Sequence, residues 1–150
     1  MAPMVEREDS VAEFEQLLSL SADVAHYNVD ELADSVTRLK EAGVDVRDGR
    51  AMLKNFVRAG VPQGDMESLA LITVQVAAAT DRSPRVASQQ TAEAFYGGDD
   101  ALRDLDRQIN FLTAEQLREV RRFQSEGKFD AAKNYAREIL TAKLAAISFP

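Results

Sequence analysis

Apolar residues along the chain recur at the three- and four-residue spacing of an amphipathic helix, and polar caps and glycine exits bound each run. The clearest example is INFLTAEQLREVRRFQSEGKFDAA, residues 109–132. Thr113 can cap the amides that open a helix, while Gln116 reaches back to the cap. The apolar face continues through Val120 until Gly127 closes the helix. Helix geometry therefore accounts for the polar residues of this stretch without a reactive site.

The same signals predict eight helices and no confident strand. The expected helices cover about residues 11–26, 29–42, 46–59, 65–80, 84–96, 99–109, 114–126 and 130–144. Ser10 with Glu13 resembles a capping box before the first helix. Residues 71–76 would also fit a buried strand, but the length and Ala-rich end of their segment favour a helix. Gly127 is expected to make the turn of an αα-hairpin.

We therefore predict an all-α fold, a compact bundle of about eight short helices with a C-terminal αα-hairpin. A chain of 150 residues is enough for one domain with a real core. We expect a disordered N-terminal tail over residues 1–9 and a single helical domain over residues 10–150. The apolar residues expected to face the core include Val11, Phe14, Leu17, Leu18, Leu32, Val36, Leu39, Met52, Leu53, Phe56, Val57, Met66, Leu69, Val76, Val86, Phe95, Leu102, Leu105, Leu117, Val120, Ala132, Tyr135, Ile139 and Leu140.

Composition narrows the class of protein further. The chain is 45% hydrophobic and 29% charged, as soluble globular proteins are, and it has no cysteine. Disulfides, thiolate zinc sites and thiol redox catalysis are excluded. The start, MAPMVERED, lacks the apolar core of a secretion signal, and the longest apolar run, residues 69–79, is too short to span a bilayer. We expect no membrane contact for this segment.

The net charge of −7 is unevenly distributed. Residues 1–50 hold 12 acids and five bases, residues 51–112 hold eight and six, and residues 113–150 hold five and seven. Nucleic acid binding is disfavoured, because it needs a continuous basic face. The one dense basic cluster is on the helix expected at 114–126, and glutamates interrupt it. The cluster consists of Arg118, Arg121 and Arg122, and the basic residues that follow it in the sequence are Lys128, Lys133 and Arg137.

The sequence offers no metal site. The single histidine, His26, has no second His or Cys to complete a transition-metal site, so a helix-end or surface position is the better interpretation. Asp45 and Asp48 precede Gly49 in the manner of a calcium loop. That loop needs a Glu at its twelfth position, where this chain has Phe56.

A catalytic carboxylate pair is also disfavoured. Asp100 and Asp104 share a face of their expected helix, but Arg103 and Arg107 interleave as ion-pair partners. There is no Gly-rich phosphate cradle, nucleophile elbow or Cys–His pair. We assign no catalytic, cofactor-binding or metal-binding residue, no cofactor and no small-molecule substrate, and we do not expect an enzyme.

The stretch INFLTAEQLREVRRFQSEGKFDAAKNYA resembles a segment of tape measure proteins from the tails of phages and prophages. In that family a similar aromatic-Leu-Thr-Ala start leads to a helix, a glycine turn and an Ala-rich helix. FVRAGVPQGDMESLALITVQVAAATDRS and AEAFYGGDDALRDLD are similar to upstream parts, so that the resemblance covers about residues 36–146. Asp81 stands where the family has Gly, and the family's members are much longer, so the chain would be a domain or fragment.

The resemblance implies a structural role in tail assembly and tail length determination. Members of the family occupy the growing tail tube and bind tail-tip and tail-assembly chaperone proteins. It also implies a place in the virion tail after assembly in the bacterial cytoplasm. No catalytic residue comes with it.

Two other classes of function remain as alternatives. EGKFDAAKNYAREIL also resembles half of a tetratricopeptide unit, with Gly127, Ala132 and Tyr135 in fitting places, which would suit a free-standing helical interaction scaffold. That fold needs stacked copies, and the sequence contains one. A small muralytic or nucleotide-using enzyme has no motif to support it.

Overall fold

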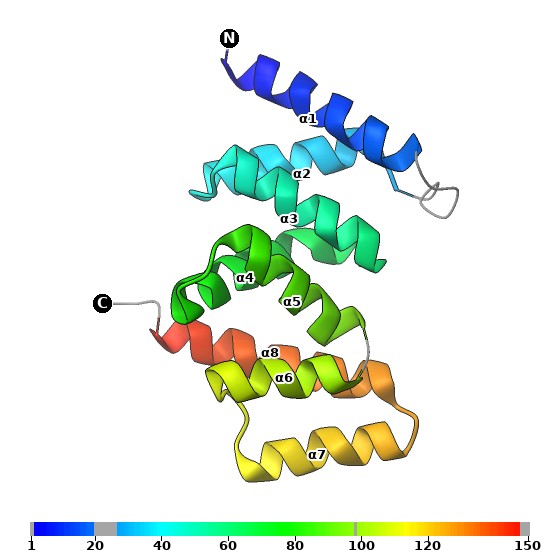
Figure 1. Ribbon diagram of the computed structural model, residues 1–150, viewed down its shortest axis with the longest axis vertical. Helices are drawn as coiled ribbons and strands as arrows, with labels where there is room; N and C mark the ends of the chain where they lie inside the picture. The colour runs from blue at the N-terminus through cyan, green and yellow to red at the C-terminus, as the bar shows by residue number, and fades with distance from the viewer. Residues whose placement is uncertain (1, 20–26, 98, 148–150) are drawn as a thin grey trace. The chain divides into compact units, whose positions relative to one another are not determined.

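The computed structural model describes residues 2–19, 27–97 and 99–147, and over these ranges the chain is helical without a strand (Figure 1). The helices are α1 (Ala2–Ser19), α2 (Val29–Glu41), α3 (Val46–Ala59), α4 (Met66–Thr80), α5 (Pro84–Tyr96), α6 (Asp99–Ile109), α7 (Ala114–Ser125) and α8 (Phe129–Ile147), with a short 3-10 turn, η2 (Gln63–Asp65). The all-α prediction is confirmed, and residues 71–76 lie within α4.

The helices form two compact units, residues 1–71 and residues 72–150. In the first unit α1 packs on α2 and α3, and α2 packs on α3. In the second unit α5 packs on α6 and α8, and α7 packs on α8. A single domain over residues 10–150 stays a prediction.

The core of the first unit consists of the apolar stripes that the sequence predicted. Phe56 of α3 and Phe14 of α1 are completely buried, as are Leu32 of α2 and Met66 at the start of α4. Burying a side chain of this size contributes about 1.5–3 kcal/mol. These side chains, which come from all four helices, therefore hold the unit together.

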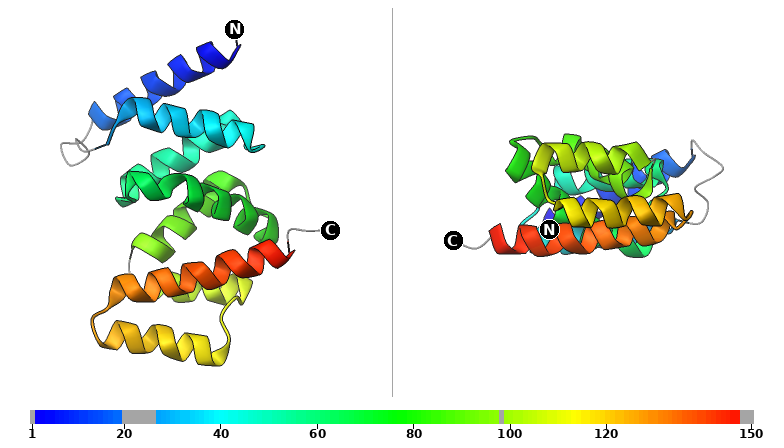
Figure 2. Two further views of the ribbon diagram at one scale, coloured as in Figure 1. Left: turned by 180° about the vertical axis from the view of Figure 1, so that it is seen from behind. Right: turned by 90° about the horizontal axis from the view of Figure 1, so that it is seen from below.

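The second unit ends in the predicted αα-hairpin of α7 and α8, whose helices lie side by side in both views of Figure 2. Gly127 turns the chain with φ of 76°, and the amide of Lys128 donates to the carbonyl of Phe123 at 2.8 Å. The ring of Phe123 meets that of Tyr135 edge to face, with 6.0 Å between centroids. Val120 is fully buried.

Helix α1 differs from the prediction. We expected a disordered tail over residues 1–9 and a helix over about 11–26, but α1 begins at Ala2 and ends at Ser19, and residues 20–26 lie outside the described residues. The predicted capping box at Ser10 is wrong, because Ser10 lies inside the helix and is buried. Its hydroxyl accepts a hydrogen bond from Arg50 Nε of α3 at 2.7 Å. A contact 40 residues away in the sequence, and not a helix start, explains the polar residue.

Some residues that were expected to face the core are less buried than predicted. Val86 is 49% exposed, because the buried face of α5 runs instead through Ala87, Thr91 and Phe95. Leu117 of α7 is half-buried, as are the outer apolar residues of α1 and α8, which are Val11, Leu17, Leu18, Tyr135 and Ile139.

Asp81 has a left-handed backbone, with φ of 54°, at the end of α4. The amide of Arg82 donates to the carbonyl of Ala77 at 2.9 Å, as in the Schellman motif that closes many helices. Glycine is preferred at the left-handed position, here occupied by Asp81, because glycine has no Cβ to clash in this conformation. This is also the position at which the sequence departs from the expected family glycine.

We expect Asp81→Gly to stabilise the protein by about 0.5–1 kcal/mol, since relief of the left-handed strain exceeds the entropy that glycine loses on folding. Urea denaturation measures the change. Gly127→Asp, which places a side chain at φ of 76°, is the matched control and should destabilise. A lower unfolding free energy for Asp81→Gly would contradict this account of the turn.

Candidate interaction surface

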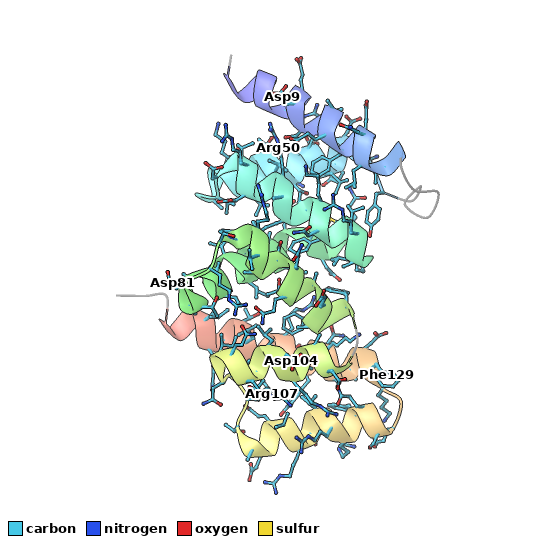
Figure 3. The ribbon with its side chains drawn as sticks, in the orientation of Figure 1. Asp9, Arg50, Asp81, Asp104, Arg107 and Phe129 are labelled. Carbon is cyan, nitrogen blue, oxygen red and sulfur yellow. The ribbon has the colours of Figure 1, made fainter. Side chains whose placement is uncertain are left out.

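A polar seam joins α1 to α3 in the first unit. The carboxylate of Glu13 of α1 forms ion pairs with Arg50 Nη1 at 3.1 Å and with Lys54 Nζ at 3.0 Å. Ser10 lies one turn earlier on the same face of α1. Arg50 lies against α1 in Figure 3. Because Ser10 and Glu13 are three residues apart, one face of α1 presents both acceptors to α3. The seam fixes the register of the two helices.

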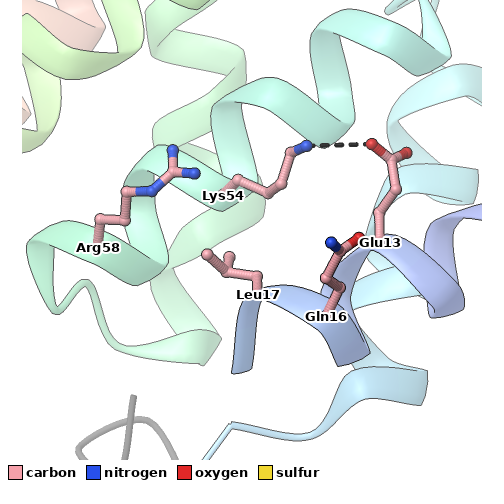
Figure 4. Close-up of a pocket in the computed structure, with 5 residues that line it drawn as sticks. All are labelled: Glu13, Gln16, Leu17, Lys54 and Arg58. Atoms are coloured by element: carbon pink, nitrogen blue, oxygen red, sulfur yellow. Dashed lines mark hydrogen bonds and ion pairs between the residues drawn. The ribbon is translucent and has the colours of Figure 1, made fainter. Parts of the chain in front are cut away.

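Below this seam lies an open pocket of about 210 Å³ (Figure 4). Lys54 and Arg58 form one wall from successive turns of α3, while Glu13, Gln16 and Leu17 form the other wall from α1. Lys54 holds Glu13, whereas Arg58 Nη1 donates to Asn55 Oδ1 at 3.1 Å. Glu13, the only carboxylate among the described residues that line the pocket, is thus already bound by cations.

A second charged network joins α2 to the start of α4. Arg38 Nε donates to Glu67 Oε1 at 2.7 Å, and its Nη2 donates to Glu31 Oε1 at 2.7 Å. The hydroxyl of Ser35 also donates to Glu67 Oε1, at 2.9 Å. The hydrogen bond from Arg38 is the main reason that the pKa of Glu67 lies below its ordinary value, and the bond from Ser35 adds to it. The hydrogen bonds that Arg38 donates to Glu67 and to Glu31 raise its own pKa.

The lowered pKa of Glu67 predicts how stability changes with pH. A carboxyl group whose folded pKa is depressed contributes stability above its unfolded pKa, and this contribution is lost as pH falls through the folded pKa. We expect Glu67→Gln to cost at most about 1 kcal/mol at pH 7, because the side chain of Glu67 is 37% exposed. The cost should shrink below about pH 4.5. Urea denaturation across this range measures the difference, Glu41→Gln is the exposed control, and a constant cost would contradict the ion pair.

Side-chain hydrogen bonds also join the residues before α2 to the connection between α3 and α4. The hydroxyl of Tyr27 donates to the carbonyl of Val61 at 2.7 Å, and burial raises the pKa of Tyr27. Asn28 caps α2 by accepting from the amide of Glu31, and Gln63 Oε1 accepts from the amide of Asn28 at 2.9 Å. The chain before α2 is therefore bound to η2, more than 30 residues away.

The basic cluster on α7 is divided by ion pairs. Arg122 pairs with Glu126 at 3.0 Å and with Glu119, and its guanidinium carbon lies 4.9 Å from the centroid of the Phe123 ring. The hydrogen bond with Arg122 lowers the pKa of Glu119. Arg118 and Arg121 are exposed. Two exposed arginines among glutamates do not form the continuous basic face that nucleic acid needs.

Two of the other basic residues considered from the sequence, Lys133 and Arg137, support helix junctions of the second unit. Lys133 Nζ donates to the carbonyl of Gly97 at 2.9 Å, and Arg137 Nη1 donates to the hydroxyl of Tyr96 at 2.7 Å. Both bonds connect α8 to the end of α5. Lys128 is exposed, and so is the next residue, Phe129, at 44% of its surface; Phe129 is labelled in Figure 3.

Two of the acidic residues considered from the sequence, Asp45 and Asp104, have structural partners. Asp45 caps α3 by accepting from the amide of Arg47 at 2.8 Å, and Asp104 pairs with Arg107 at 3.0 Å (Figure 3). Asp106 accepts from the amide of Leu112 at 2.9 Å and so fixes the turn before α7. Among the described residues no group of three His, Cys, Asp or Glu side chains could hold a metal ion. His26 lies outside these residues.

The pocket of α1 and α3 is the feature that the sequence did not predict. Lys54 and Arg58 are four residues apart, and Gln16 and Leu17 follow Glu13 by three and four, so each wall has helical spacing. Nothing in this spacing shows that the two walls face each other. No helix in the described part of the chain is long and apolar enough to cross a membrane.

A model of the family described as prophage tail length tape measure protein matches residues 2–121. No curated protein and no solved structure matches the chain significantly. The match begins earlier than the resemblance expected over residues 36–146, because it includes α1 and the chain before α2. It ends within α7, so that the Gly127 turn and the Ala-rich α8 lie outside the matched residues.

Proposed function

We propose, because the chain belongs to the prophage tail length tape measure family, that it acts in tail assembly and tail length determination through contacts with other proteins. Family membership makes the chain a phage tail component. The proposed partners are the tail tube, tail-tip or tail-assembly chaperone proteins, and the proposed place is the virion tail after assembly in the bacterial cytoplasm. We propose no catalytic role.

The observation that carries this proposal is the length of the family match. The matched residues 2–121 include α1 to α6 and much of α7, and therefore all of the first compact unit except residue 1. A match confined to one amphipathic helix would say little, since such patterns recur in many helical proteins. A match across many helices and their turns reflects a shared arrangement of elements.

The packing of the first unit favours a folded binding domain over a stretched ruler. Arg7 Nε of α1 donates to Asp34 Oδ1 of α2 at 2.9 Å, and Arg50 of α3 reaches Ser10 of α1. These contacts join residues that are 27 and 40 positions apart in the sequence, and a fully extended helical segment would break them. We therefore propose that the segment acts folded, as a surface for tail-assembly proteins.

An in-frame deletion of residues 36–146 in the phage tests the role. As one continuous helix these 111 residues would span about 170 Å, from a rise of about 1.5 Å per residue. Electron microscopy of the deletion phage should show aborted tails if the segment is an assembly-binding domain. Complete tails about 170 Å shorter would indicate a ruler segment, and complete tails of unchanged length would remove the tape measure role of this region.

The free-standing tetratricopeptide-like scaffold has only the α7–α8 hairpin in its favour. Gly127 makes the turn of this hairpin, and the ring of Tyr135 packs against that of Phe123. The family match ends before this turn and covers the preceding helices instead. The tape measure role therefore has the wider support.

A further inference from the structure

We propose that the pocket between α1 and α3 binds a carboxylate side chain, glutamate or aspartate, of a partner protein. That the partner is a protein rests on the proposed function. The chemistry of the ligand rests on the pocket alone, and the geometry that supports it is in Figure 4.

The charge of the pocket is the first argument. Among the described residues that line it there are two cations, Lys54 and Arg58, and one carboxylate, Glu13. Glu13 Oε1 accepts from Lys54 and its Oε2 lies 3.1 Å from Arg50, so both of its oxygens are engaged. Arg58 is exposed and, within the described part of the chain, donates to the neutral amide oxygen of Asn55 without an ion-pair partner. A guanidinium presents five donors, and a carboxylate matches their fork geometry.

The shape and surroundings of the pocket limit the ligand further. The half-buried side chain of Leu17 lies beside the two cations and offers an apolar contact to the methylene stem of a glutamate. Residues 1–71 carry 14 acids and seven bases, so this positive pocket lies in a unit of net charge −7. Such a unit repels an extended polyanion such as nucleic acid, whereas a single carboxylate from a folded partner is attracted locally.

The purified full chain and a capped glutamate, N-acetyl-L-glutamate amide, provide the test. Backbone amide NMR shifts are followed as the compound is added at low salt, and N-acetyl-L-glutamine amide serves as the uncharged control of the same shape. We expect saturable shifts confined to residues of α1 and α3 that line the pocket, and none with the glutamine compound. Shifts spread without saturation over all cationic residues would overturn the proposal.

Arg58→Gln removes the charge while keeping most of the side-chain length. We expect it to weaken the binding of capped glutamate about fivefold, in the range for a partly exposed ion pair. Arg118→Gln on the exposed face of α7 is the matched control and should leave binding unchanged. Equal binding of capped glutamate by wild type and Arg58→Gln would overturn the proposal that the pocket binds a carboxylate. Aborted tails in the deletion phage together with such a result would leave the proposed function standing, so the two failures are distinguishable.

Discussion

Phe56→Asp is expected to unfold the first unit. Phe56 is completely buried in α3, and truncating a buried phenylalanine to alanine alone costs about 3–5 kcal/mol. The aspartate adds an unpaired charge in an apolar site, which costs several kcal/mol more or forces the side chain to neutralise. The total approaches the whole stability of a typical domain, about 5–15 kcal/mol.

Hydrogen exchange measured by mass spectrometry would locate this unfolding. We expect the amides of α2 and α3 to lose their protection in Phe56→Asp. Arg47→Asp, on the exposed side of the same helix, is the control and should change the free energy of unfolding by less than about 0.5 kcal/mol. Retained protection of α2 and α3 in Phe56→Asp would show that the ring does not lie in the core as described.

Val120→Asp is expected to separate α7 from α8. Val120 is the fully buried side chain on the inner face of α7, whereas Leu117, one turn earlier, is half-buried. The charge at Val120 should cost about 3–5 kcal/mol, and Leu117→Asp should cost less than half as much, because its carboxylate can reach water.

Exchange protection along the hairpin separates these two variants. In Val120→Asp the amides of α7 should become unprotected while those of α2 and α3 keep their protection, since α7 packs on α8 in the second unit. Leu117→Asp should keep most of the protection of α7. Equal losses in both variants would show that α7 meets α8 through a different face.

Local chemistry explains which parts of the fold could be predicted from the sequence. The hydroxyl of Thr113 accepts from the amide of Gln116 at 3.1 Å, and Gln116 Oε1 accepts from the amide of Thr113 at 2.9 Å. The whole capping box therefore lies within four residues. Gly60 and Gly127 close their helices with left-handed φ values of 77° and 76°. Signals of this kind lie within one helical turn and leave a pattern that can be recognised without tertiary structure.

Contacts between distant residues explain what could not be predicted. Ser10 has the spacing of a cap, but its partner is Arg50 on another helix. Asn28 caps α2, yet Gln63, and not Glu31, completes the reciprocal bond. Glu31 is bound to Arg38 instead. The same side chains fit both local and distant partners, and only the packing of the helices decides between them.

The pocket was missed for the same reason. Lys54 and Glu13, 41 residues apart, belong to separate charge patterns in the sequence, and each looks like an ordinary solvated helix face. The distribution of charge did indicate that the first part of the chain is strongly acidic. It could not show that the cations of α3 and the side chain of Leu17 of α1 line one concave site.

Tail morphology in a phage that carries Phe56→Asp tests the central claim most directly, because this substitution removes the fold of the first unit without changing the length of the chain. With the level of the altered protein matched to wild type by immunoblotting, and Arg47→Asp as control, electron microscopy should show aborted tails for Phe56→Asp and complete tails for the control. Complete, infectious tails of normal length in the Phe56→Asp phage would contradict the claim that the segment acts as a folded binding domain.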